Sequence, residues 1–339
     1  MGDNPAAAGR ASGPGSPAQE PEGAGAARSD LRALTGKVMR RVLQTLIVLF
    51  GISVIAFALV RLAPGNPAAL LMPVDATAEQ LAAMEARMGL DQPAVVQYFR
   101  YVGNLVRGDF GYSYFYQQDV ATLIGRALPN TALLGFAAML ISLGIAIPLG
   151  MLAAIRRGTV WDSMAMFAAL IGQSMSSVWL AVLLVLVFAV KLGWLPTSGS
   201  GGIEYIILPA LCLASQDYAL STRMLRSGMI GALGQDYIMA ARARGIPKRR
   251  VHWQYAFKNA ALPLLTVVGS QIGGVLAGSL IVERIFNWPG IGLLMANAIA
   301  ARDFQLIQSI LLISGLIYTV LALVVDALYT VLDKRIAAS

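Results

Sequence analysis

Long apolar runs separated by shorter polar stretches dominate the pattern along this chain. A hydrocarbon core about 30 Å thick needs roughly 20 apolar residues for each helix that crosses it. Six runs qualify, namely residues 40–62, 128–154, 163–190, 204–227, 260–282 and 306–331. The sequence therefore predicts an all-α integral membrane protein with six transmembrane helices.

The composition agrees with this prediction. A chain of 339 residues that is 57% hydrophobic and only 13% charged is too apolar for a soluble protein of its size.

The distribution of Lys and Arg predicts the orientation of the chain, because short cytoplasmic loops concentrate these residues. An even number of spans places both termini on one side of the membrane. Together with residues 155–162 and 223–258, the termini (residues 1–41 and 332–339) hold 18 of the 26 Lys and Arg residues. Residues 63–125 hold three basic residues against six acidic ones. We therefore expect a multi-pass protein of the cytoplasmic (plasma or inner) membrane, with both termini in the cytoplasm.

The chain divides into a tail and a membrane domain. Residues 1–36 are rich in Ala, Gly, Pro and Ser without apolar periodicity, which predicts a disordered cytoplasmic tail and leaves a regulatory role open. Residues 37–339 form the transmembrane domain. Within it, the extracytoplasmic segment 63–127 contains TAEQLAAMEARMGL, which opens on a Thr cap, and QPAVVQYFRYVGNLVRG. Both stretches predict short amphipathic helices that lie on the membrane surface or cover a pathway.

The residues needed for common catalytic sites are missing. Cys212 is the only cysteine, which excludes disulfides and thiolate metal sites, and His252 is the only histidine, which excludes a multi-histidine metal centre and argues against a Ser-His-Asp triad. Gly36-Lys37 lacks the upstream Gly and the following hydroxyl of a phosphate-binding loop. We therefore expect no enzyme activity, no metal and no cofactor in this chain. The net charge of +8 follows from membrane topology and does not indicate nucleic-acid binding.

Two acidic residues lie inside the apolar runs, where a carboxylate is a candidate functional group. Asp217 belongs to the polar stretch 215–218 and either lines a polar cavity or pairs with an arginine of a neighbouring helix. Asp326 lies less than two turns from the cytoplasmic end of the last run. At that position we expect a structural role, in which the side chain extends to the membrane surface or forms a salt bridge.

The fifth run contains GSQIGGVLAGSL, in which glycines recur four residues apart. Small residues at this spacing allow a second helix to approach closely. This helix either packs tightly within the bundle, or lines a pathway or the interface with a second subunit. The candidate pathway or packing residues are Asp217, Gly269, Gln271, Gly273, Gly274 and Gly278.

Residues 236–258, between the fourth and fifth runs, begin as a helix, break at Gly245 to Pro247 and then turn strongly basic. The stretch QDYIMAARARGIPKRRVHWQYAFKNAALPLLTVVG resembles the cytoplasmic "EAA" loop of ATP-binding-cassette (ABC) importer permeases, in the form found in the dipeptide/oligopeptide permease family. Supporting stretches are RLAPGNPA at 61, MGLDQPAVVQYFRYVGNLVRGDFGYSY at 88, FAVKLGWLPTSG at 188, VERIFNWPGIGLL at 282, ARDFQLIQ at 301 and VVDALYTVLD at 324. The resemblance covers about residues 38–335 and is to the first, DppB/OppB-like permease subunit.

The resemblance implies a type I ABC importer permease fold, with a cytoplasmic coupling helix between the fourth and fifth spans. Met239 replaces the acidic residue that names the motif. The Ala/Gly face of the helix is expected to lie in a groove of an ATPase, with Pro247 ending the helix. The implied ATPase-coupling residues are Asp236, Tyr237, Met239, Ala240, Ala241, Ala243, Gly245, Ile246 and Pro247.

The resemblance also implies partners and a function. The partners are a second permease subunit (DppC/OppC-like), two ATP-binding subunits (DppD/DppF-like) that bind ATP and Mg, an extracytoplasmic solute-binding protein, and membrane lipid. The implied function is import of di- and oligopeptides, with this chain forming half of the pathway. Three alternatives remain open at this point: a permease of the same family for nickel or another non-peptide solute, a proton-coupled secondary transporter that uses Asp217 and Asp326, and a non-transporting membrane scaffold.

Overall fold

The computed structural model describes residues 43–58, 62, 68 and 76–332, so the expected tail 1–36 and most of RLAPGNPA lie outside the described residues. The chain separates into two compact units, residues 1–47 and 48–339. The first unit contributes only the start of helix Leu43–Ala58 to the described residues, and all contacts given below belong to the second.

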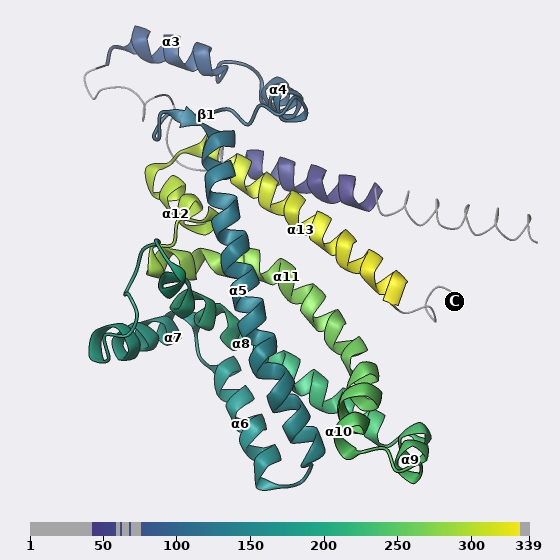
Figure 1. The fold of residues 1–339 in the computed structure, drawn as a ribbon. Coiled ribbons are helices and arrows are strands. Elements are labelled where there is room, and N and C mark those ends of the chain that lie inside the picture. Colours follow the sequence, from purple (N-terminus) through teal and green to yellow (C-terminus); the bar gives the residue numbers. More distant parts are fainter. Residues whose placement is uncertain (1–42, 59–61, 63–67, 69–75, 333–339) are drawn as a thin grey trace, which may run out of the picture. The chain divides into compact units, whose positions relative to one another are not determined.

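The described chain is almost entirely helical (Figure 1). After helix Leu43–Ala58, the elements are α3 (Ala78–Met88), α4 (Ala94–Val106), β1 (Tyr112–Ser113), β2 (Gln118–Asp119), α5 (Val120–Ile155), α6 (Val160–Ser174), α7 (Ser177–Leu184), π-helix η1 (Val185–Lys191), α8 (Ile203–Leu233), α9 (Asp236–Ala243), α10 (Lys248–Arg250), π-helix η2 (Val251–Phe257), α11 (Lys258–Phe286), α12 (Ile291–Ala301) and α13 (Phe304–Leu332).

Two of the described helical segments, Val120–Ile155 and Phe304–Val325, are long and apolar enough to cross a membrane, and a third crossing results if α6 and α7 with η1 count as one broken span. The prediction of one continuous helix over 163–190 is wrong, because the chain bends by 104° between α6 and the segment formed by α7 and η1. Met175 and Ser176 both adopt extended backbone conformations at this break. Serine is more favourable at a helix end than in a helix interior. A hydropathy pattern does not include this preference, so it does not predict the break.

The two short amphipathic helices expected before the second apolar run are present as α3 and α4. Thr77 caps α3 as expected: its side chain accepts a hydrogen bond from the backbone N–H of Gln80, whose own side chain accepts from the N–H of Thr77. Gly89 ends the helix with a positive φ of 68°. The antiparallel β1–β2 hairpin and helix α12 were not expected from the sequence.

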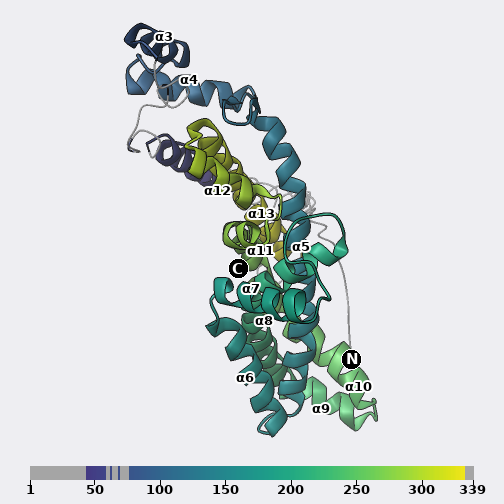
Figure 2. The same ribbon diagram turned by 90° about the vertical axis from the view of Figure 1, so that its left-hand side faces the viewer.

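Helix α8 is the centre of the packing and lies beside α5 in both views (Figures 1 and 2). It also packs against α6 and α11. A Cβ added at Gly150 of α5 would lie 3.0 Å from the carbonyl oxygen of Thr222, and one added at Gly228 would lie 2.9 Å from that of Ala260 in α11. These glycines therefore allow α8 to approach both neighbours closely.

Helix α5 begins at Val120, earlier than the expected residue 128, and its two ends contribute to separate apolar clusters. With 36 residues it is about 54 Å long. Its first two turns pack with α12 and α13 around Ile124, Ala127, Met295 and Leu306. Its last turn packs with α8, α9 and α11, in the cluster that contains Met151 and Ala154.

A buried carboxylate joins three helices at the start of α12. Glu283 of α11 is fully buried, and its Oε1 accepts a hydrogen bond from the hydroxyl of Thr131 in α5 at 2.8 Å. Its Oε2 accepts from the backbone N–H of Leu293 at 3.1 Å, while the Thr131 hydroxyl oxygen accepts from the N–H of Ile291 at 2.8 Å. The first turn of a helix carries unsatisfied N–H groups, and the Glu283 side chain supplies a buried acceptor for one of them.

Replacing Glu283 tests whether this cluster stabilises the fold. Glu283→Ala leaves the Leu293 N–H and the Thr131 hydroxyl without their buried acceptor, so we expect the free energy of unfolding to fall by about 3 kcal/mol. Glu283→Gln keeps one carbonyl oxygen and should lose less. The reaction of buried Cys212 with a thiol-reactive dye during heating in detergent measures this loss, because the thiol becomes accessible only when the bundle opens.

The matched control is Arg284→Ala, at the exposed neighbouring position, whose side chain bonds Asn297 at the surface. Surface changes of this kind alter the unfolding free energy by about 0.5 kcal/mol or less. Equal effects of Glu283→Ala and Arg284→Ala would contradict a stabilising role for the cluster.

Candidate functional site

The connection between α8 and α11 contains the residues that the sequence singled out for coupling. Helix α9 begins after Gln235, and the chain continues through α10 and η2 into α11 without leaving helical geometry after Pro247. Seven residues in π-helical geometry, Val251–Phe257, lead directly into α11. From Lys248 onwards α10, η2 and α11 therefore form one continuous helical segment, which the turn at Gly245 to Pro247 separates from α9.

The inner face of α9 is anchored in the apolar cluster at the ends of three helices. Ile238 and Ala241, three residues apart, are 0% and 4% exposed. They pack in one cluster with the following buried residues of α5, α8, η2 and α11: Met151, Ala154, Leu225, Met229, Ala232, Val251, Ala256, Ala260 and Leu264. Ala241 is thus buried within this chain and is not available to a partner, contrary to the expectation that it contributes to an outward Ala/Gly face.

The outer face of α9 is exposed and combines small, apolar and basic side chains. Met239 is 60% exposed and Tyr237 is 38% exposed, and the Tyr237 hydroxyl accepts a hydrogen bond from the side-chain amide of Asn259 at 2.8 Å. The other exposed residues are Asp236, Ala240, Arg242 and Ala243. This outer face and the turn that follows it are called the α9 surface below.

Gly245 reverses the chain after α9. Its φ is +74°, a conformation that glycine adopts without steric cost, and its N–H donates to the carbonyl of Arg242 at 3.0 Å. A Cβ at this position would meet no atom within 4 Å, so the backbone conformation favours glycine here and a lack of space does not. The expectation that Pro247 ends the helix is wrong: α9 ends at Ala243, and Pro247 stands immediately before α10.

The segment after this turn is strongly basic. All three residues of α10, Lys248, Arg249 and Arg250, are exposed. Partial burial and the positive charges of Arg242 and Lys248 lower the pKa of His252 below its usual value. The imidazole is therefore neutral at pH 7, and the positive charge of this surface comes from its arginines and lysines.

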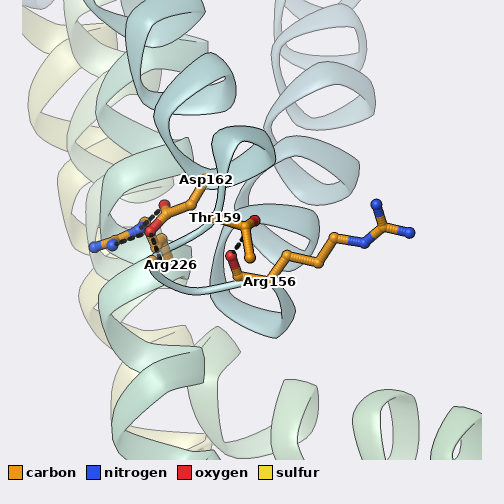
Figure 3. A network of polar contacts seen from close by, with 5 residues as sticks. Arg156, Thr159, Asp162 and Arg226 are labelled. Atoms are coloured by element: carbon orange, nitrogen blue, oxygen red, sulfur yellow. Dashed lines mark hydrogen bonds and ion pairs between the residues drawn. The ribbon is translucent and has the colours of Figure 1, made fainter.

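An ion pair fixes the neighbouring α5–α6 turn to α8 (Figure 3). Nε and one terminal nitrogen of Arg226 each donate to a different oxygen of Asp162 at 2.7 Å, which is a bidentate arrangement. Asp162 also accepts a hydrogen bond from the backbone N–H of Gly158 at 3.0 Å. Arg226 follows Leu225 of the apolar cluster, so this turn lies at the same end of the bundle as α9.

Of the polar candidate pathway residues on α8 and α11, Gln271 bonds the neighbouring helix and the carboxylate of Asp217 does not. Gln271 of α11 joins the helices: its amide nitrogen donates to the backbone carbonyl of Asp217 at 3.0 Å, and its oxygen accepts from the hydroxyl of Ser221 at 3.2 Å. The carboxylate of Asp217 is only partly buried, and within the described residues no ion pair or hydrogen bond reaches it. The arginine partner considered for Asp217 is thus not found in the described part of the chain.

The glycines of α11 also differ from one another. Gly273 is a packing residue, because a Cβ there would collide with the ring of Tyr318 in α13. Gly274 is exposed, with nothing within 4 Å of an added Cβ, and Gly269 is partly buried. The surroundings of Gly278 and the side chain of Asp326 lie outside what the structure describes.

Comparison with known proteins identifies the family. Residues 146–338 match the family described as "Binding-protein-dependent transport system inner membrane component", and residues 35–135 match the N-terminal region of membrane components of such systems. The chain is 37% identical to the oligopeptide transport system permease protein AppB of Bacillus subtilis (strain 168), over 88% of this chain and 98% of that protein. It is 36% identical to the glutathione transport system permease protein GsiC of Escherichia coli (strain K12), over 88% and 98% of the two chains.

A solved structure agrees at the level of the fold. A chain of the MetNI methionine ABC transporter, in inward-facing conformations, superposes with a TM-score of 0.54 at 15% identity, covering 62% of this chain and 96% of that one. The family matches and the identity to relatives over most of its length show that this chain belongs to the family of binding-protein-dependent transport system inner membrane components, and that it is a permease subunit of an ABC importer and not an enzyme.

Proposed function

We propose that this permease imports di- and oligopeptides and forms half of the translocation pathway. The observation that carries the proposal is the identity of 36–37% to permeases named for oligopeptide and glutathione transport, which extends over nearly the whole of those proteins. Glutathione is itself a peptide, so both names indicate the same class of substrate.

The proposed topology has six spans with both termini in the cytoplasm. The spans are helix Leu43–Ala58, α5, the broken pair of α6 with α7 and η1, α8, α11 and α13. The charge distribution supports this orientation, because the exposed basic residues of α9 and α10 lie at one end of α8, whereas α3, α4 and the hairpin precede α5 at its other end.

The α9 surface is proposed to contact an ATPase subunit. The family description names a membrane component only, so ATP and Mg are expected in the two partner ATPases. A contact with Met239 and the exposed alanines would move α9, and buried Ile238 and Ala241 would transmit that motion to α5, α8 and α11. Nucleotide shifts the conformational equilibrium only through different affinities for the two states, and such a contact that exists in one state more than in the other supplies the difference.

The remaining partners follow from the same family membership. A second, similar permease is proposed to complete the pathway, and a solute-binding protein is proposed to deliver substrate at the end of the bundle that carries α3 and the β1–β2 hairpin. The hairpin is held to the membrane helices there: the Ser113 hydroxyl of β1 donates to the carboxylate of Asp303, just before α13. In the segment that leads into β1, the carbonyl of Phe110 accepts from the side chains of Gln305 and Ser309, at 3.1 Å and 2.9 Å. It is therefore a firm part of the surface on which a binding protein would dock.

Uptake by the reconstituted complex tests the proposed substrate. With both permeases, both ATPases and the binding protein in vesicles, we expect ATP-dependent accumulation of labelled di- and oligopeptides that unlabelled peptides inhibit and Ni²⁺ does not. Accumulation of nickel without peptide uptake would exclude the peptide assignment. Uptake driven by a proton gradient without the ATPases would exclude the importer mechanism.

The proposed contact of the α9 surface is tested by a charge placed at Gly245. Both Asp and Asn tolerate a positive φ, so Gly245→Asp and Gly245→Asn differ mainly in charge. A surface that carries Arg242, Arg244 and Lys248 is complementary to a negative partner, and an added carboxylate opposes that complementarity. We expect Gly245→Asp to weaken co-purification with the ATPases roughly 5- to 150-fold, which corresponds to about 1 to 3 kcal/mol.

Gly245→Asn is the matched control and should remain close to the unaltered chain. Arg250→Glu should do so as well, since Arg250 lies in α10, outside the α9 surface, and its side chain bonds Gln254 of η2. Quantitative pull-down of the ATPases by the tagged permease measures the effect, and membrane levels report on folding. Normal recovery of the ATPases with Gly245→Asp would contradict the proposed contact.

A further inference from the structure

Helix α4 contacts the rest of the chain on two of its faces. On the polar face, the amide nitrogen of Gln97 donates to the carbonyls of Leu90 and Gln92 at 3.1 Å and 2.7 Å. The guanidinium of Arg100 lies beside Gly89, where an added Cβ would approach its Nη1 to 2.6 Å. This face therefore holds the turn between α3 and α4.

The second face packs against helix Leu43–Ala58 through Tyr98 and Tyr101. The hydroxyl groups of Tyr98 and Ser53 share a hydrogen bond of 2.7 Å, and the Tyr98 ring meets Phe57 edge to face with centroids 5.3 Å apart. Tyr98 also contacts the ring of Phe50, and Tyr101 stacks on Phe57. Contacts at positions 50, 53 and 57 extend over about 10 Å of the helix axis. Helix α4 therefore contacts the second half of the apolar helix.

The third face of α4 is apolar and exposed. Val95, Phe99 and Val106 are 65%, 67% and 84% exposed. Their spacing of four and seven residues places them in one stripe along the helix. Exposed Arg100 and Arg107 lie on the polar side of this stripe. A stripe of large apolar side chains next to arginines is typical of a helix that lies in the interface of a bilayer.

The neighbouring helix indicates which occupant covers this stripe. Phe50 and Ile55 of helix Leu43–Ala58 are 63% and 60% exposed, and that helix is the first proposed span, so these side chains face lipid. Because α4 packs against this helix through Tyr98 and Tyr101, a bilayer that covers Phe50 and Ile55 extends to α4 as well. A solute-binding protein that arrives and leaves would expose the stripe to water between its visits, whereas lipid covers it continuously.

We propose that the stripe formed by Val95, Phe99 and Val106 inserts into the boundary between headgroups and acyl chains of the bilayer. Helix α4 is then a membrane-surface anchor that holds α3 and the start of the hairpin at a fixed height above the entrance of the pathway. Arg100 and Arg107 lie where lipid phosphates are found, and phosphate attracts their charge. This inference depends on the chain being a membrane permease and on its first span, but not on the identity of the transported solute.

Single spin labels on the full chain in vesicles of phosphatidylethanolamine and phosphatidylglycerol test the proposal. Cys212→Ser removes the native thiol, and Phe99→Cys and Val106→Cys place a label on the stripe. Ile55→Cys serves as the lipid reference and Ala83→Cys, on the exposed side of α3, as the water reference. We expect labels at 99 and 106 to collide more with oxygen than with a water-soluble nickel chelate, as at 55, and the label at 83 to show the reverse order.

A second variant tests whether the apolar side chains of the stripe themselves hold α4 in the bilayer, or whether α4 only lies near lipid. Phe99→Asp places a charge in the middle of the stripe, and a label at Val106→Cys should then lose its preference for oxygen. Labels at 99 and 106 that behave like the label at 83 would overturn the proposal. It would equally be overturned if these labels became shielded from the chelate only after a solute-binding protein is added, because the stripe would then be a protein-docking surface. Neither result would affect peptide uptake by the complex, which tests the proposed function separately.

Discussion

The burial of Ile238 and Ala241 against the ends of α5, α8 and α11 is the contact on which the proposed coupling depends. The two side chains hold α9 to the bundle by close packing alone, and densely packed interiors move as a unit because a small gap already forfeits much of the attraction between atoms. In the proposed mechanism, a partner bound to the outer face of α9 would act through this packing on all three long helices. The turn at Gly245 then leads through α10 and η2 into α11, so α9 is joined to α11 by the chain as well as by packing.

The bilayer imposes the second constraint, because polar groups in a low-dielectric surrounding need partners within the protein. Arg226 pairs with Asp162, Gln271 bonds α8, and Glu283 accepts hydrogen bonds from α5 and from the start of α12. Each of these contacts joins segments far apart in sequence, so satisfying the polar groups also fixes the arrangement of the helices. The partly buried carboxylate of Asp217 differs, because within the described residues its side chain bonds no other group. It remains the candidate polar group of the pathway.

Hydropathy and local capping rules were sufficient for the elements that depend on nearby residues. Thr77 and Gln80 predict the start of α3 because both halves of the capping box lie within four residues. The early start of α5 was missed because Val120 and Ile124 are buried by α12 and α13, which follow more than 150 residues later. The break at Met175 was missed because hydropathy averages over the serines around it.

In the candidate site, too, features set by nearby residues were predictable and features set by distant residues were not. The helix at 236–243 and the turn at Gly245 follow from local sequence, and Gly245 adopts the positive φ that glycine favours. Which side of α9 is buried depends on Met229 and Met151, and the sequence does not show that these residues reach Ala241. Glu283 was quoted only as part of the resemblance, although a carboxylate shortly before the Pro-Gly-Ile-Gly stretch at the start of a helix was a usable signal.

A photo-crosslinking residue at position 239 in the intact complex tests the central claim most directly. Met239 is 60% exposed on the outer face of α9, and a reactive group there should form a covalent product with an ATPase subunit. The same group at Ala83, on α3, should form no such product. Products at position 239 that contain only lipid or the second permease, with the complex intact and active, would contradict the assignment of α9 as the contact through which ATP hydrolysis drives transport.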